Sequence, residues 1–159
     1  KTSRPDQPVD GEAGVVDYDS GDLPAAHLLA LQISGHLFDA AVDPEHPASL
    51  SFNHTTRTLR ERFGFKSVVV TDSLDMGAIT QRYSVEEACI LAINAGADIL
   101  LDANNSPGPQ RACPAPVMHG AVMQALARSK ITGGEDRLRA SWRRLESMRS
   151  AFRGNDPRG

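Results

Sequence analysis

Short apolar segments alternate with amphipathic helical patterns along most of the chain. Residues 68–70 are three consecutive valines, a pattern typical of a strand buried on both faces, as in a parallel sheet. Residues 28–34 and 98–101 are apolar runs of strand length and predict two further strands. Helical spacing fills the intervals, at 53–63 and 85–94. This order predicts βα units with parallel strands.

Boundary residues define the two helices between these strands. Gly64 follows a helical turn with two basic residues, a composition that favours a helix C-terminus. Ser84 and Glu87 predict a capping box at the start of the second helix, because each side chain can bond the other residue's backbone N–H. Gly96 predicts the end of that helix.

The last third of the chain predicts a loop and two helices. Residues 104–116 are rich in proline and predict a long loop, and 117–129 have helical spacing. Thr132 and Glu135 predict a second capping box. In the final helix we expect Trp142 to be a packing anchor rather than a platform for a sugar. It belongs to an apolar stripe with three- and four-residue spacing: Leu138, Trp142, Leu145 and Met148.

Composition divides the chain into three parts. Residues 1–26 are rich in Asp, Gly, Pro and Ser and predict an irregular leader. Residues 27–153 carry the βα pattern, and 154–159 form a tail. Two prolines within 43–47 deny that segment a strand ladder and predict a loop after the first strand.

Asp72 is the main candidate for a functional side chain, because it lies at the end of the valine strand, next to Thr71. Side chains at the carboxyl ends of parallel strands sit where α/β folds place their ligands. Position alone leaves two interpretations open: a functional carboxylate, or a cap for the next turn, since Thr-Asp-Ser is also a good capping sequence. Asp102 has the equivalent location after the next strand.

Several segments resemble one enzyme family. The run Val-Val-Val-Thr-Asp-Ser-Leu-Asp-Met-Gly-Ala-Ile at 68–79 is similar to the nucleophile segment of glycoside hydrolase family 3, particularly its bacterial β-N-acetylhexosaminidase branch. Gly35-His36 with 43–51, then 83–88, 92–101 and 131–152, resemble flanking segments of that family in the same order. The resemblance extends from about residue 30 to residue 153.

The resemblance implies a fold and a reaction. The fold is a partial (β/α)8 TIM barrel of the α/β class, roughly its C-terminal half. The reaction is retaining hydrolysis that removes terminal β-linked N-acetylglucosamine from peptidoglycan fragments or chitin-like oligosaccharides, without a cofactor. Asp72 falls on the family's catalytic nucleophile.

Other residues take expected roles through the same resemblance. His36 is expected to bind sugar hydroxyls or to support the site, against an alternative in which it only hydrogen-bonds a neighbouring loop. Met76 is expected to contact substrate, with a role in the core as the alternative. Asp75 is too close along the chain to Asp72 to flank a glycosidic bond, because retaining enzymes separate their two carboxyl groups by about 5–5.5 Å with a sugar between them. It is therefore interpreted as a turn or supporting residue.

Two segments of the family are not found in these 159 residues. They are a Lys-His-Phe-Pro-Gly-His-Gly segment that holds the sugar and an Asp-His loop that serves as general acid/base. A closed barrel also needs about 200–250 residues. These observations leave two hypotheses: a truncated glycosidase, or a non-catalytic barrel remnant that binds sugar or a partner chain. A remnant has exposed sheet edges, so its expected partner is the missing barrel half or another copy of itself.

Bulk properties exclude several other classes. A formal charge of −3 argues against nucleic acid or an anionic membrane as the main partner, and no apolar run approaches the length of a membrane span. The compartment stays open between bacterial cytoplasm and secretion. Cys89 lies in an apolar helical pattern and is interpreted as a buried small hydrophobe.

Metal and nucleotide sites are not expected either. His27, His46, His54 and His119 show no shared spacing suited to a metal. A small flavodoxin- or Rossmann-type domain is a fold alternative only, since no Gly-x-Gly-x-x-Gly follows a predicted strand.

Overall fold

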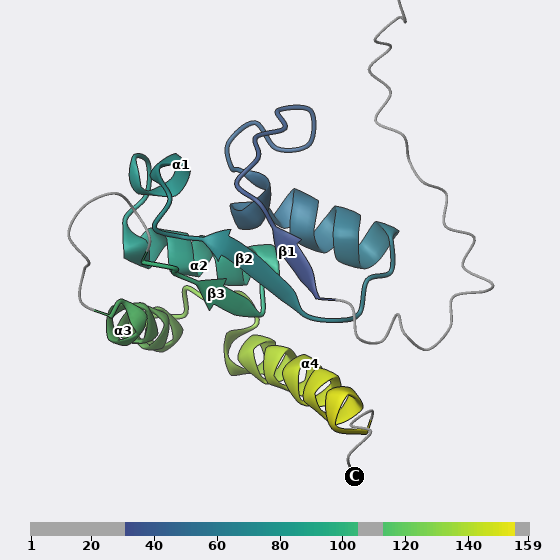
Figure 1. Ribbon diagram of the computed structural model, residues 1–159. Helices are drawn as coiled ribbons and strands as arrows, with labels where there is room; N and C mark the ends of the chain where they lie inside the picture. Colours follow the sequence, from purple (N-terminus) through teal and green to yellow (C-terminus); the bar gives the residue numbers. More distant parts are fainter. Residues whose placement is uncertain (1–30, 105–112, 155–159) are drawn as a thin grey trace, which may run out of the picture.

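The computed structural model describes residues 31–104 and 113–154, with side chains through residue 152 (Figure 1). Three strands form one sheet in the order β1 (Gln32–Ser34), β2 (Val69–Ser73) and β3 (Ile99–Leu101). Both neighbouring pairs are parallel, which confirms the predicted α/β class. The predicted leader 1–26, part of the first predicted strand, residues 105–112 of the predicted loop, and residues 155–159 lie outside the described residues.

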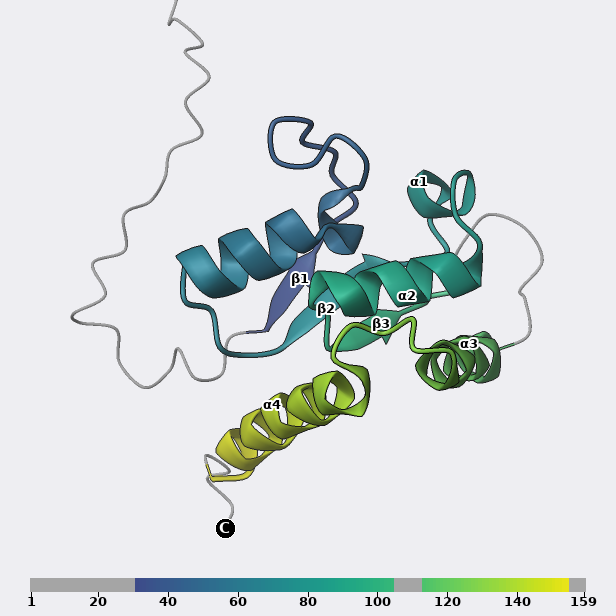
Figure 2. The same ribbon diagram turned by 180° about the vertical axis from the view of Figure 1, so that it is seen from behind.

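Helices connect consecutive strands and cover one face of the sheet. η3 (Asn53–Arg62) lies between β1 and β2, and α2 (Val85–Ala95) lies between β2 and β3. In the view from behind, both helices lie in front of the sheet (Figure 2). Four further helical elements complete the described fold, namely η2 (Ala48–Leu50), α1 (Gly77–Thr80), α3 (Ala115–Ala127) and α4 (Gly134–Gly154).

The opposite face of the sheet is open at the β1 edge. Val68 and Val69 are 0 % exposed, as the valine run predicts. Ile33, Val70 and Ile99 are register partners and therefore share a face of the sheet. Ile33 is nevertheless 58 % exposed. In a closed barrel such a position would point toward other strands.

The first connecting helix is confirmed, but its winding is wider than an ordinary α-helix. The Phe63 N–H donates to the Thr58 carbonyl oxygen, five residues back, at 3.0 Å. Helices with i→i+5 hydrogen bonds are rare, and the spacing of apolar residues in the sequence does not predict them. Gly64 has a φ of +68° and ends the helix at the predicted position.

The second connecting helix has the predicted boundaries to within one residue. Ser84 accepts a hydrogen bond from the Glu87 N–H while the Glu87 side chain accepts from the Ser84 N–H, so the capping box is present. Gly96 has a φ of +119°, and a Cβ there would meet Thr56 Oγ1 at 2.6 Å. Glycine is therefore required both by the left-handed backbone and by the close approach of η3.

The core lies between α2, α3 and the carboxyl end of β2. Cys89 is 0 % exposed in its centre, and burial, with a smaller effect of Asp102, raises the pKa of its thiol to about 11. This confirms its interpretation as a buried small hydrophobe. The other buried members of the cluster are Leu50, Leu74, Ile79, Ala88, Ala92, Ala97 and Met118.

α4 begins later than the Thr132 capping box predicts. The helix starts at Gly134, and both Gly133 and Gly134 have left-handed backbone, with φ values of +78° and +53°. Left-handed backbone at both positions separates Thr132 from the first helical turn, and the Glu135 carboxylate pairs instead with Arg139 at 3.1 Å. α3 likewise begins at Ala115, so the predicted loop ends before Pro116.

Trp142 is not the packing anchor that the sequence predicts. It is 59 % exposed, whereas a polar stripe on the same helix contacts the described fold. Arg137, Ser141 and Arg144 form this stripe, at the i, i+4 and i+7 positions of one helical face. The prediction was wrong for Trp142, although Leu138 of the same apolar stripe does pack, against the cluster of Ile93, Ala125 and Ile131.

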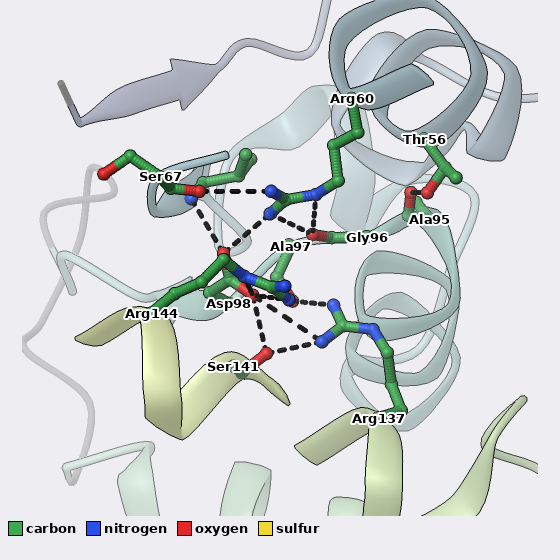
Figure 3. A network of polar contacts seen from close by, with 11 residues as sticks. Thr56, Arg60, Ser67, Ala95, Gly96, Ala97, Asp98, Arg137, Ser141 and Arg144 are labelled. Atoms are coloured by element: carbon green, nitrogen blue, oxygen red, sulfur yellow. Dashed lines mark hydrogen bonds and ion pairs between the residues drawn. The ribbon is translucent and has the colours of Figure 1, made fainter. Parts of the chain in front are cut away.

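That polar stripe binds one buried carboxylate, Asp98, which lies directly before β3 (Figure 3). The Asp98 side chain is 0 % exposed. Its oxygens lie 2.7 Å from Arg144 Nη2, 2.7 Å from Arg60 Nη2 and 2.6 Å from Ser141 Oγ. The Val69 N–H also donates to it, at 3.0 Å, and Arg137 Nη1 lies 3.6 Å away. One carboxylate thus joins η3, β2, β3 and α4.

Hydrogen bonding and charge decide the ionisation of this cluster. Burial raises the pKa of Asp98, but hydrogen bonds from Arg144, Ser141 and the Val69 N–H, together with the charge of Arg60, outweigh it and leave the pKa below its ordinary value. Burial also lowers the pKa of the Arg60 and Arg137 guanidinium groups, although Asp98 opposes that shift.

The same arginines bind the carbonyl groups at the end of α2. Arg60 donates to the Gly96 oxygen at 2.9 Å, and Arg137 donates to the Ala97 oxygen at 2.6 Å. The C-terminal end of a helix carries partial negative charge and unpaired carbonyl groups. The cluster therefore compensates three cations with one carboxylate and one helix terminus.

Candidate functional site

A bulge in β2 forms the candidate site at the carboxyl end of the sheet. Val70 pairs with Ile99 and Ser73 with Leu101, so three steps along β2 match two along β3. The Thr71 hydroxyl accepts the Leu101 N–H at 3.0 Å, within this irregularity. A bulge of this kind re-aims the side chains beside it and is common next to active sites.

Asp72 lies inside this bulge rather than after the strand. β2 continues to Ser73, so the predicted end of the strand was too early by two residues. The Asp72 side chain is half-buried, and its Oδ1 accepts the Ser73 N–H at 2.7 Å. Within the described residues, Oδ2 accepts no hydrogen bond. One oxygen is therefore held while the other is available for a ligand.

His36 supports the end of β2 with both ring nitrogens. Nε2 lies 2.8 Å from the Ser73 carbonyl oxygen, which can only accept, so Nε2 donates. Nδ1 lies 2.6 Å from Ser49 Oγ, and in the neutral ring it accepts that hydroxyl proton. His36 thus ties the segment after β1 and the η2 turn to the strand that carries Asp72. Substrate binding by His36 stays a prediction.

Ser73 and Asp75 close the turn after β2. The Ser73 hydroxyl donates to Asp75 Oδ1 and accepts the Ala103 N–H at 2.7 Å. Asp75 is 6 % exposed and lies in the turn, as its interpretation as a turn residue requires. The pair thus fixes the strand end to the segment that follows β3.

Met76 and Asp102 complete the surroundings of the site. Met76 is 41 % exposed, so the alternative that placed it in the core was wrong. Asp102 directly follows β3, in the location equivalent to the one the sequence predicts for Asp72. Within the described residues, no group of three or more His, Cys, Asp or Glu side chains is arranged to hold a metal ion.

Asp43 orders the loop that leads from β1 to η2. Its Oδ1 accepts the N–H groups of Glu45 and His46, both at 3.0 Å, and its Oδ2 accepts the Ser51 hydroxyl at 2.6 Å. Burial raises the pKa of Asp43, but these hydrogen bonds outweigh it and bring the pKa to about 2. The loop next to the site is therefore held by an ionised carboxylate.

We expect Asp43→Asn to lower the free energy of unfolding by about 2 kcal/mol at neutral pH. The folded-state pKa lies below the unfolded value, so the ionised side chain stabilises the fold above pH 4 to 5 and loses that contribution as pH falls toward 2. Urea unfolding of parent and variant across this range measures it. A difference that stays constant with pH would contradict the assignment.

The hydroxyls that shape the site were not predicted from the sequence. Thr71, Ser73 and Ser49 each place an oxygen at a strand end or turn beside Asp72 or His36. The only signal in the sequence is a small polar residue at a position where a buried strand is expected to be apolar. Thr71 and Ser73 are such residues, with 0 % and 4 % of their surface exposed. Serine and threonine are too common for that signal to identify a site without the fold.

Comparison with known proteins places the chain in a family. Residues 14–141 match the glycosyl hydrolase family 3 N-terminal domain. The chain is similar to the β-N-acetylglucosaminidase of Thermotoga maritima, with 31 % identity and a TM-score of 0.64 over 75 % of this chain and 24 % of that one. It is also similar to a family 3 β-N-acetylglucosaminidase from Paenibacillus sp. str. FPU-7, with 33 % identity and a TM-score of 0.66 over 76 % of this chain and 22 % of that one.

A curated relative agrees with these structures. Beta-hexosaminidase A of Pseudoalteromonas piscicida is 42 % identical over 55 residues, which are 35 % of this chain and 9 % of that protein. The chain spans about a quarter of the length of the Thermotoga enzyme. Because the match covers most of the chain and the sheet is parallel as the TIM-barrel domain requires, this protein belongs to glycosyl hydrolase family 3, within its N-terminal domain.

Proposed function

We propose that Asp72 is the nucleophile of a retaining glycoside hydrolysis that acts on terminal β-linked N-acetylglucosamine. The observation that carries the proposal is the presentation of this carboxylate. It is half-buried in the bulge of a parallel strand, with Oδ1 held by the Ser73 N–H and no bond to Oδ2 from the described residues. When a nucleophile is fixed near the reacting carbon, that placement supplies much of the rate enhancement of the reaction.

The reaction proceeds in two displacements. An Asp72 oxygen forms a bond to the anomeric carbon as the bond to the leaving oxygen breaks, which gives a glycosyl ester on Asp72. Water then attacks the same carbon and releases one proton to solvent, and Asp72 leaves as a free carboxylate. A phenolate leaving group needs no proton, whereas a sugar alkoxide does. For these 159 residues tested alone, activated aryl glycosides are therefore the proposed substrates, and natural disaccharides are expected to be turned over far more slowly.

Two neighbours of Asp72 take supporting roles in this proposal. His36 donates a hydrogen bond to the Ser73 carbonyl oxygen and so fixes the backbone next to Asp72. Met76 is exposed beyond the turn and is assigned to contact with the sugar. The substrate would be a peptidoglycan fragment or a chitin-like oligosaccharide.

A second function, binding of sugar or a partner chain without turnover, has its own support. The open sheet face exposes 58 % of Ile33, and the Thermotoga relative contains about four times the length of the matched region. In this alternative Asp72 contacts a sugar hydroxyl and forms no covalent bond.

Covalent trapping separates the two functions. A 5-fluoro-N-acetylglucosaminyl fluoride carries a good leaving group, and its ring fluorine slows hydrolysis of the glycosyl ester. We expect intact-mass spectrometry to show one added fluorosugar, and peptide mapping to place it on Asp72. Asp39→Asn is a matched control, because Asp39 is an exposed carboxylate in the loop after β1. The side-chain oxygen of the variant can still accept the hydrogen bond from the Ala41 N–H.

The contrary results are defined by the same assay. Absence of label in the parent, with saccharide binding still visible as chemical-shift changes, would favour the non-catalytic function. Label on another carboxylate would remove Asp72 from the mechanism.

A further inference from the structure

A hollow of about 550 Å³ lies between the C-terminal end of η3, the connection into β2, and α4. It is at the amino end of the sheet, away from Asp72, as its lining residue Ser67 shows. Apolar side chains and cations share the lining, and no acidic residue of the described ranges contributes to it. The residues that matter for its chemistry are Leu59, Phe63, Phe65, Lys66, Arg143 and Arg144.

Two of the three cations of this hollow lack a carboxylate partner among the described residues. Arg144 shares Asp98 with Arg60 and Arg137. Lys66 and Arg143 are exposed, and neither has an ion-pair partner among the residues that the structure describes. A cationic site above an apolar floor favours an anionic ligand with apolar side chains.

One acidic segment of this chain is connected directly beside the hollow. The Gln32 N–H donates to the Val68 carbonyl at 3.0 Å, so β1 starts next to Ser67, at the rim of the hollow. Residues 6–22 hold six carboxylates, no Lys or Arg, and the apolar residues Val15, Val16 and Tyr18. The nine residues from 22 to 31 can span up to about 30 Å, enough to cross the hollow.

We propose that this hollow is a docking site for the acidic segment 6–22 of the same chain. Its carboxylates pair with Lys66 and Arg143, and its apolar residues cover Phe63 and Phe65, of which Phe63 is 59 % exposed. The tether makes docking an intramolecular event with a high effective concentration, so weak ion pairs suffice. This proposal is independent of the proposed function of Asp72.

Zero-length carbodiimide crosslinking of the full chain tests the contact directly. The reagent joins a lysine amine to a carboxylate only when the two touch. In an equal mixture of ¹⁵N-labelled and unlabelled chains, we expect Lys66 crosslinked to a carboxylate of 6–22 with both peptides of the same isotope. Crosslinks that mix isotopes would make a second copy the occupant and overturn the proposal, as would the absence of a crosslink from Lys66 to this segment.

A charge reversal with a matched control checks the cause. Arg143→Glu should lower the Lys66 crosslink yield several-fold, and so should high salt, because the ion pairs are exposed and screened. Arg139→Glu is the control, since Arg139 lies on the same helix, is exposed and does not line the hollow. An equal yield in the two variants would contradict docking by charge.

Discussion

Replacement of Asp98 with alanine is expected to lower the free energy of unfolding by roughly 3–5 kcal/mol, the usual cost of breaking a buried ion pair on one side. Arg60, Arg137 and Arg144 would then share a site without a compensating carboxylate. The Val69 N–H would also lose its acceptor. Urea unfolding followed by circular dichroism measures the loss, and limited proteolysis should cut α4 first because its described polar stripe binds Asp98.

Two comparisons isolate the charge effect. Glu146→Ala removes an exposed carboxylate that pairs with Arg149 on the same helix, so it should change the stability by less than about 1 kcal/mol. Adding Arg144→Met to the Asp98→Ala variant should recover part of the loss, since one uncompensated cation is removed. A double variant that is less stable than Asp98→Ala by the full cost of Arg144→Met alone would show that the two residues are uncoupled.

Asp72→Ala is expected to lower the turnover of a dinitrophenyl N-acetylglucosaminide by at least about a thousandfold, the scale on which loss of a reacting residue lowers kcat. The variant keeps the Ser73 N–H and the bulge but has no oxygen to attack the anomeric carbon. Release of dinitrophenolate, followed by absorbance, measures the rate.

A series of leaving groups tests the same mechanism in the parent protein. Parent activity should fall steeply as the pKa of the phenol rises, because no described residue is assigned to protonate the leaving oxygen. Asp39→Asn should match the parent throughout. Equal rates in Asp72→Ala and the parent would remove Asp72 from the reaction, whatever the fold.

The elements predicted best are those that local chemistry determines. Three valines specify a buried strand, and the Ser84–Glu87 pair and Gly96 fix the ends of α2, because a capping box and a left-handed glycine act within one helical turn. The parallel order of the strands follows from the helices between them. Asp72 became the candidate nucleophile because a carboxylate interrupts an apolar run, and its role stays a prediction.

The features that were missed depend on partners distant in the chain. Arg144 and Asp98 are 46 positions apart, and an arginine-rich helix face is usually solvated, so only the i, i+4, i+7 spacing of Arg137, Ser141 and Arg144 could have indicated a buried contact. The bulge in β2 is defined by its register against β3 and has no signature in β2 alone. His36 shows the same dependence, since its partners are Ser49 and Ser73.

The distance along β2 between Asp98's contact at Val69 and the bulge at Asp72 has a consequence for the attachment of α4. The polar anchor and the proposed nucleophile therefore lie toward opposite ends of the same strand. Among the described residues, the attachment of α4 does not involve the bulge. Substitutions at the bulge are expected to leave the resistance of α4 to proteolysis unchanged.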